Sequence, residues 1–222
     1  MPKLALSTKL SNINNEVKAL VVMFVLYFVG VLGFVFLKNW NFILLTPLNL
    51  LISLFVALRF QEDRGVHFYL TAVAVATIGF FIEVIGVNTG LIFGAYRYGP
   101  VLGVSWLSTP LSISVNWLLL VYCSAALVNL GLPTHCSRLL RALIASLLMV
   151  GLDVVIEPVA IATDMWRWEL VQVPLQNYVG WFVSAFLLHY LMLFFTNIGS
   201  NRVAAAIFLM QCAFFAVLNL LL

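Results

Sequence analysis

Apolar residues fill long, continuous stretches of this 222-residue chain, and charged residues stand mostly between them. A helix needs about 20 mostly apolar residues to cross the hydrocarbon core of a bilayer. Such stretches recur at about residues 19–37, 41–58, 67–87, 107–130, 141–162, 177–198 and 203–222. They are uninterrupted runs, whereas the strands of a membrane barrel alternate polar and apolar residues. The pattern predicts an all-α integral membrane protein, a bundle of about seven transmembrane helices forming a single domain over residues 1–222.

The composition agrees with this pattern. Hydrophobic residues make up 64% of the chain and charged residues only 9%. Soluble domains carry about 25% charged residues, because their surface has to be hydrated. We therefore expect a multi-pass protein of the cell (inner or plasma) membrane. The first span is too long for a cleaved signal peptide, and we expect it to remain in the mature protein.

The basic residues predict an orientation, because cytoplasmic loops carry an excess of Lys and Arg. If the seven spans cross the membrane in alternating directions, eight basic residues lie on one side of it and three on the other. The eight are Lys3, Lys9, Lys18, Arg59, Arg64, Arg138, Arg141 and Arg202, and the three are Lys38, Arg97 and Arg167. We expect the N-terminus in the cytoplasm and the C-terminus outside.

Two segments, residues 80–117 and 154–181, share an order of motifs. Each has Ile-Glu late in a span, then an aromatic-Arg-aromatic triplet, a Pro-Leu pair, and an Asn and a Trp in the next span. The triplets are Tyr96-Arg97-Tyr98 and Trp166-Arg167-Trp168. Because both hairpins would run in the same direction, this pattern indicates a parallel repeat of the 3-4 and 5-6 hairpins.

Three acidic residues fall inside predicted spans, Glu83 in the third and Asp153 and Glu157 in the fifth. Insertion scales assign roughly 2.5–3.5 kcal/mol to each acid near the centre of a membrane helix. Asp153 and Glu157 lie four residues apart and so share one helical face. The alternatives to a functional site are helix–helix hydrogen bonds, or ion pairs with Arg97 or Arg167.

Small residues surround the first of these acids. Gly79, Gly86 and Gly90 lie on the same face of the third span as Glu83. A smooth face of this kind suits close helix packing or a flat ligand.

The predicted topology brings polar groups from four spans to one level. Spans three and five both run outward, so Glu83 and Glu157 reach a similar depth, and spans four and six begin at that surface. The residues that these two spans add are Asn116, Trp117, Asn177 and Trp181. Convergence of a few polar groups in an apolar environment is typical of a ligand or active site.

These groups limit the chemistry. The cysteines and histidines are scattered, which disfavours a metal site, and the last span has no lysine for a retinal Schiff base. A carboxylic acid enclosed by apolar groups beside a second acid can stay protonated at neutral pH. It could protonate an alkene, and aromatic rings could stabilise the resulting cation. Capture of the cation by water gives hydration, and capture by an internal alkene gives cyclisation.

Several motifs resemble CruF-type carotenoid 1,2-hydratases over roughly residues 75–190. They are Glu83, Gly86-Val87-Asn88-Thr89-Gly90, Phe93-Gly94, Tyr96-Arg97-Tyr98, Leu102-Gly103, Asp153, Glu157-Pro158, Trp166-x-Trp168, Val173-Pro174, Asn177 and Gly180-Trp181. The resemblance implies a cofactor-independent hydro-lyase without a metal. It would add water across the terminal 1,2 double bond of an acyclic ψ end group, as in lycopene, γ-carotene or a fifty-carbon carotenoid.

Together, the residues and the resemblance give a set of expected site residues. Glu83 or the Asp153 and Glu157 pair would supply the proton, and another acid with Asn177 would hold and deprotonate water. The expected substrate-binding residues are Asn88, Thr89, Tyr96, Arg97, Tyr98, Asn116, Trp117, Trp166, Trp168, Asn177 and Trp181. The expected partners are a carotenoid entering from the bilayer, water, membrane lipid and other enzymes of carotenoid biosynthesis, with no nucleic acid.

Two other functions use the same residues. A carotenoid cyclase or isomerase would need the same buried acid and aromatic rings, and its product would be an isomer of unchanged mass. A proton-coupled membrane transporter is the second alternative, because acids within spans also mark ion pathways.

Overall fold

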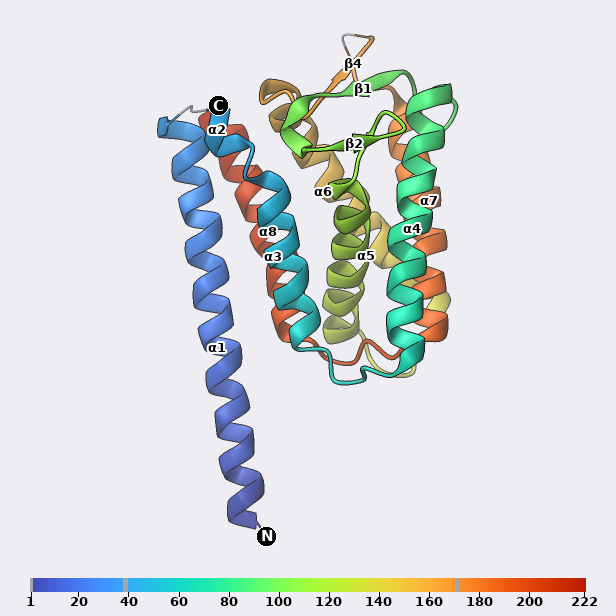
Figure 1. The fold of residues 1–222 in the computed structure, drawn as a ribbon. Helices are drawn as coiled ribbons and strands as arrows, with labels where there is room; N and C mark the ends of the chain where they lie inside the picture. Colours follow the sequence, from blue (N-terminus) through green and yellow to red (C-terminus); the bar gives the residue numbers. More distant parts are fainter. Residues whose placement is uncertain (1, 38–39, 171) are drawn as a thin grey trace.

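The computed structural model describes residues 2–37, 40–170 and 172–222, and it is a bundle of α-helices (Figure 1). The helices are α1 (Pro2–Leu32), α2 (Trp40–Ile43), α3 (Thr46–Arg59), α4 (Val66–Thr89), α5 (Ser112–Gly131), α6 (Arg138–Ala162), α7 (Leu175–Phe195) and α8 (Arg202–Leu221). Within the described residues, six of them are long and apolar enough to cross a membrane, and α3 is a shorter apolar helix. The prediction of an all-α membrane bundle is confirmed. The orientation stays a prediction, and Lys38, one of the residues behind it, lies outside the described residues.

Helix α5 is the centre of the bundle. It packs against α3, α4, α6, α7 and α8, and 67% of its most apolar stretch is buried inside the bundle. Helix α1 is the opposite case, because only 22% of the most apolar stretch of its span, residues 13–36, is buried. It packs chiefly against α8 at the margin of the bundle (Figure 1). Most of the surface of α1 is therefore available to lipid.

The second predicted span, residues 41–58, is divided in the structure. The short helix α2 ends at Ile43, and α3 begins at Thr46 with Pro47 in its first turn. Proline is accepted in a first turn because no intrahelical partner is needed for its missing N–H. Further inside a helix it would remove a hydrogen bond, so the chain starts a new helix here.

Short strands cap the end of the bundle that carries the C-terminus (Figure 1). Strand β1 (Tyr96–Tyr98) pairs antiparallel with β4 (Trp166–Trp168), and β2 (Ser105–Trp106) pairs with β3 (Thr109–Pro110). The fourth span was predicted from residue 107, but α5 begins only at Ser112. The reason is the β2–β3 hairpin, whose turn residues Leu107 and Ser108 have φ angles of 51° and 65°, as a tight two-residue hairpin turn requires.

Polar side chains close the opposite end of the bundle. The Tyr122 hydroxyl donates to Gln61 Oε1 at 2.6 Å and accepts from Asn201 Nδ2 at 2.7 Å. The Gln61 amide in turn donates to the Asn197 carbonyl at 2.7 Å. These bonds join the loop after α3 to α5 and α8, so the helix ends are fixed on the side away from the strands.

Candidate active site

Glu83 lies on α4 and points into the bundle, where only 2% of the residue is exposed. Its Oε2 accepts hydrogen bonds from the hydroxyls of Tyr96 and Tyr98, the latter at 2.9 Å. Its Oε1 accepts from Trp117 Nε1 at 3.1 Å. Both carboxyl oxygens of Glu83 are therefore occupied by neutral donors.

Glu157 lies on α6 and has a similar arrangement. Its Oε2 accepts from Trp166 Nε1 and from Trp168 Nε1, both at 3.0 Å, and its Oε1 accepts from Asn177 Nδ2 at 3.3 Å. All three partners are N–H groups, which can donate but not accept. These hydrogen bonds stabilise a negative charge on Glu157, while burial of the group acts in the opposite direction.

Asp153 stands one turn before Glu157 on the same face of α6, and it is also buried. Asn177 Nδ2 donates to its Oδ2 at 2.9 Å and so bridges the two acids. The other oxygen, Oδ1, is buried and accepts no hydrogen bond within the described part of the chain. Among the described residues, Asp153 is therefore hydrogen-bonded through Oδ2 alone.

The two glutamates are held by one ribbon made of the two triplets. The register pairs Tyr96 with Trp168, Arg97 with Arg167 and Tyr98 with Trp166. Because side chains alternate along a strand, the four rings point toward the bundle and both arginines point away. Each glutamate accepts from the two rings of the triplet that follows it and from one residue of the next helix. The repeat in the sequence thus has a counterpart in the hydrogen bonds.

The phenols of the ribbon are neutral donors. Burial, and next the nearby Glu83 carboxyl group, raise the pKa of both Tyr96 and Tyr98 well above the ordinary value of tyrosine. Both hydroxyls consequently keep their protons across the physiological range of pH.

A cavity of about 70 Å³ lies beneath the ribbon, between α3, α4, α5, α6, α7 and α8. The three acids line it together with apolar and aromatic groups. The predicted site residues that line it are Glu83, Tyr96, Tyr98, Asn116, Asp153, Glu157, Trp166, Trp168, Asn177 and Trp181. Trp117 lies behind this lining, where it bonds to Glu83 and stacks on Trp181 with ring centroids 4.9 Å apart.

Two glycines of α4 let the aromatic groups approach Glu83. A Cβ added at Gly79 would lie 2.6 Å from Trp117 Cβ, and one added at Gly86 would lie 2.5 Å from the Phe93 ring. Phe93 in turn packs edge-on against Tyr96. At Gly79 and Gly86 this face of α4 is therefore covered by closely packed side chains rather than open to a flat ligand.

Besides Trp117, three predicted binding residues do not line the cavity. Asn88 is exposed at the end of α4 and donates to the Val84 and Leu107 carbonyls, so it holds the β2–β3 turn. Thr89, also exposed, donates to Ile85 O. Arg97 faces away from the cavity because of the alternation along β1.

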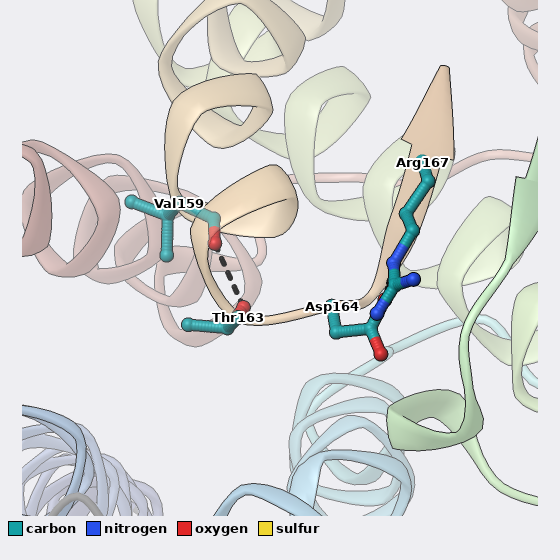
Figure 2. Close-up of polar contacts among 4 residues, drawn as sticks. All are labelled: Val159, Thr163, Asp164 and Arg167. Atoms are coloured by element: carbon teal, nitrogen blue, oxygen red, sulfur yellow. Dashed lines mark hydrogen bonds and ion pairs between the residues drawn. The ribbon is translucent and has the colours of Figure 1, made fainter. Parts of the chain in front are cut away.

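The arginines also do not neutralise the buried acids within the described part of the chain. Arg167 Nε donates to Asp164 Oδ1 at 2.5 Å on the outer side of the ribbon. Figure 2 shows Arg167 reaching back along β4 to Asp164, next to the end of α6, where the Thr163 hydroxyl donates to the Val159 carbonyl. The predicted alternative of ion pairs with the buried acids is therefore wrong for Arg167, and no such pair is formed by Arg97 in the described residues.

The sequence prediction missed the part of the cavity built by α3 and α8. Thr46, Leu50, Gln211 and Phe215 line it, and the Gln211 Oε1 is buried and accepts no hydrogen bond within the described residues. The available signal was Gln211, one of two amides, with Asn219, in an otherwise apolar span. The described residues contain no group of three or more His, Cys, Asp or Glu side chains arranged to hold a metal ion.

A family model described as "Carotenoid biosynthesis protein" matches residues 38–222. Over 120 residues the chain is 36% identical to a bisanhydrobacterioruberin hydratase of Haloarcula japonica, and this alignment covers 52% of the chain and 41% of that relative. The match thus spans less than half of the relative's length. No solved structure matches the chain.

Proposed function

The chain belongs to the carotenoid biosynthesis protein family, and from this premise we propose that it is a hydro-lyase that adds water across the terminal 1,2 double bond of an acyclic carotenoid. The hydratase name of the Haloarcula relative supports the reaction class. The cavity supports it as well, since it combines buried acids with an aromatic and aliphatic lining.

The observation that carries the mechanism is which of the six carboxyl oxygens of Glu83, Asp153 and Glu157 accept hydrogen bonds. Five of them accept hydrogen bonds, namely both oxygens of Glu83, both of Glu157 and Oδ2 of Asp153. Within the described residues, only Oδ1 of Asp153 does not. A proton donor needs an oxygen that can reach the substrate, so Asp153 is the acid in this proposal.

In the first step the O–H bond of Asp153 breaks. The electron pair of the terminal double bond forms a new C–H bond at the carbon that carries one hydrogen, and a tertiary cation remains on the carbon that carries two methyl groups. Asp153 becomes a carboxylate, one turn of α6 from Glu157.

The cation is stabilised by charge and by rings. Glu157, held by three N–H donors, supplies a fixed negative charge in an apolar site, where electrostatic stabilisation is strong. The ring faces of the ribbon add cation–π attraction. Glu83 has a positioning role, because its hydrogen bonds fix the two phenols.

In the second step a water oxygen attacks the cation and forms the C–O bond. The resulting oxonium group returns one proton to the Asp153 carboxylate, which restores the acid and leaves a tertiary alcohol. Asp153 Oδ1 and Gln211 Oε1 are the two buried acceptors of this cavity without partners among the described residues, and both suit the hydrogens of a water molecule.

Expression in cells that accumulate lycopene tests this proposal, with the pigments separated by chromatography and weighed by mass spectrometry. The expected product is heavier than lycopene by one water molecule. An isomer of unchanged mass would favour the cyclase or isomerase. An unaltered pigment, together with proton-driven flux in proteoliposomes, would favour the transporter.

A further inference from the structure

A second cavity, of about 190 Å³, adjoins the acid cavity. The two share five lining residues, which are Thr46, Leu50, Met165, Gln211 and Phe215. They therefore adjoin at a junction built from α3, α8 and Met165, which follows the end of α6. We call the second cavity the α1–α3 groove, because its other wall consists of Leu26, Tyr27, Val29, Gly30 and Phe34 on or just after α1.

The α1–α3 groove is apolar, and none of its lining residues is charged. Its polar groups largely satisfy one another: Tyr27 and Ser53 share a hydrogen bond at 3.1 Å, and the Ser53 hydroxyl donates to Asn49 Oδ1 at 3.4 Å. Rings of four phenylalanines, Phe34, Phe42, Phe214 and Phe215, provide much of the remaining surface. Such a lining suits a hydrocarbon.

The groove also reaches the outer surface of the bundle. Val29 on α1 is 46% exposed and Leu48 on α3 is 52% exposed, and both line it. In Figure 1, α1 stands beside α3 and α8 at the edge of the molecule, and its main packing partner is α8. A molecule dissolved in the bilayer could thus enter between α1 and α3 without crossing water.

We infer that the α1–α3 groove binds the conjugated chain of the carotenoid while its end group lies beside Asp153; this inference rests on the proposed function. The reaction needs only the terminal double bond among the acids, so the rest of a long, rigid polyene has to leave the acid cavity. The α3–α8 junction, where the two cavities share lining residues, is the place where the chain would pass from one to the other. Gln211 then marks the boundary between the polar end, where water reacts, and the apolar groove.

The test compares two leucines of α3 that are equally exposed, at 52% each, but of which only Leu48 lines the groove. Leu48→Trp places an indole in the mouth, and Leu51→Trp is the matched control. Each variant, in lipid nanodiscs, is given a long acyclic carotenoid and a short terpene alkene with the same end group. Since remote binding energy contributes to turnover, Leu48→Trp should lower kcat/KM for the long substrate about tenfold more than for the short one.

A second pair tests the other wall. Leu26→Trp on α1 fills the groove from the inside, and Leu32→Trp on the same helix lies outside it. Leu26→Trp should show the same selective loss, and Leu32→Trp should match the unaltered protein with both substrates. Equal losses for long and short substrates in both groove variants, or no loss in either, would overturn the inference.

A binding measurement separates this inference from the proposed function. Asp153→Asn should retain the long carotenoid, detected by its visible absorption in the purified protein, and adding Leu48→Trp should abolish that absorption. If the unaltered protein hydrates neither substrate, the proposed function fails. If it hydrates both while the groove variants bind and convert the long carotenoid normally, only the groove assignment fails.

Discussion

Replacement of Asp153 by asparagine removes the proposed proton donor and changes little else. The asparagine carbonyl can accept the hydrogen bond that Asn177 Nδ2 now makes to Oδ2 at 2.9 Å. The amide nitrogen then takes the place of Oδ1, toward which no described residue donates. The substitution keeps the hydrogen bond from Asn177 and puts the N–H groups of the amide where the acid has its O–H, so we expect the free energy of unfolding to fall by no more than about 1–3 kcal/mol.

The expected loss of rate is large. A positioned general acid contributes about 10²- to 10⁴-fold, and each factor of ten corresponds to about 1.4 kcal/mol of activation free energy. The amide cannot protonate an alkene, and the oxygens of Glu83 and Glu157 are all engaged. We expect Asp153→Asn to lower the hydration rate at least about 10³-fold, which raises the barrier by about 4 kcal/mol.

The assay measures the hydrated carotenoid formed by protein in nanodiscs, and thermal unfolding is followed in the same samples. The matched control is Asp164→Asn, which makes the same change in an acid that pairs with Arg167 outside the acid cavity. The control should keep its rate. Retention of more than about a tenth of the rate by Asp153→Asn would refute the assignment of the proton donor, because a tenfold change lies below the range of general acid catalysis.

Three further predictions follow from the contacts around the cavity. Glu157→Gln leaves one acceptor oxygen for three N–H donors, so unfolding should become easier by about 1–3 kcal/mol and the rate should fall; a full rate at reduced stability would show that the charge is not used. Gly79→Ala places a methyl group 2.6 Å from Trp117 Cβ, and thermal unfolding should show a loss of about 1–3 kcal/mol, whereas an unchanged midpoint would contradict the packing. Arg97→Ala and Arg167→Ala, whose guanidinium groups face away from the cavity, should each change stability by only about 0.5 kcal/mol and leave turnover intact; loss of turnover in either would place that arginine at the substrate.

The helices could be predicted from the sequence because lipid imposes a strong pattern on a chain. Long apolar runs identified the membrane helices, and at two places local chemistry moved a boundary. Pro47 starts a new helix within the second predicted span, and the turn at Leu107 and Ser108 delays the start of α5. Both effects depend on single residues, which an average over 20 residues does not register.

The acids of the candidate site could be predicted because burying them is costly, which makes them conspicuous in an apolar helix. The orientation of Arg97 could not, since it depends on a three-residue strand that forms only by pairing with β4. The contribution of α3 and α8 was also missed. Gln211 carries no charge, and its place in the same cavity as Asp153 arises from the packing of helices far apart in the sequence.

The most direct measurement is the mass of the pigment formed in water labelled with the heavy oxygen isotope. The account predicts that the unaltered protein converts an acyclic carotenoid to a product that contains one oxygen from the labelled water, and that Asp153→Asn forms none of it. An isomer of unchanged mass, or a labelled product formed equally by Asp153→Asn, would contradict the account.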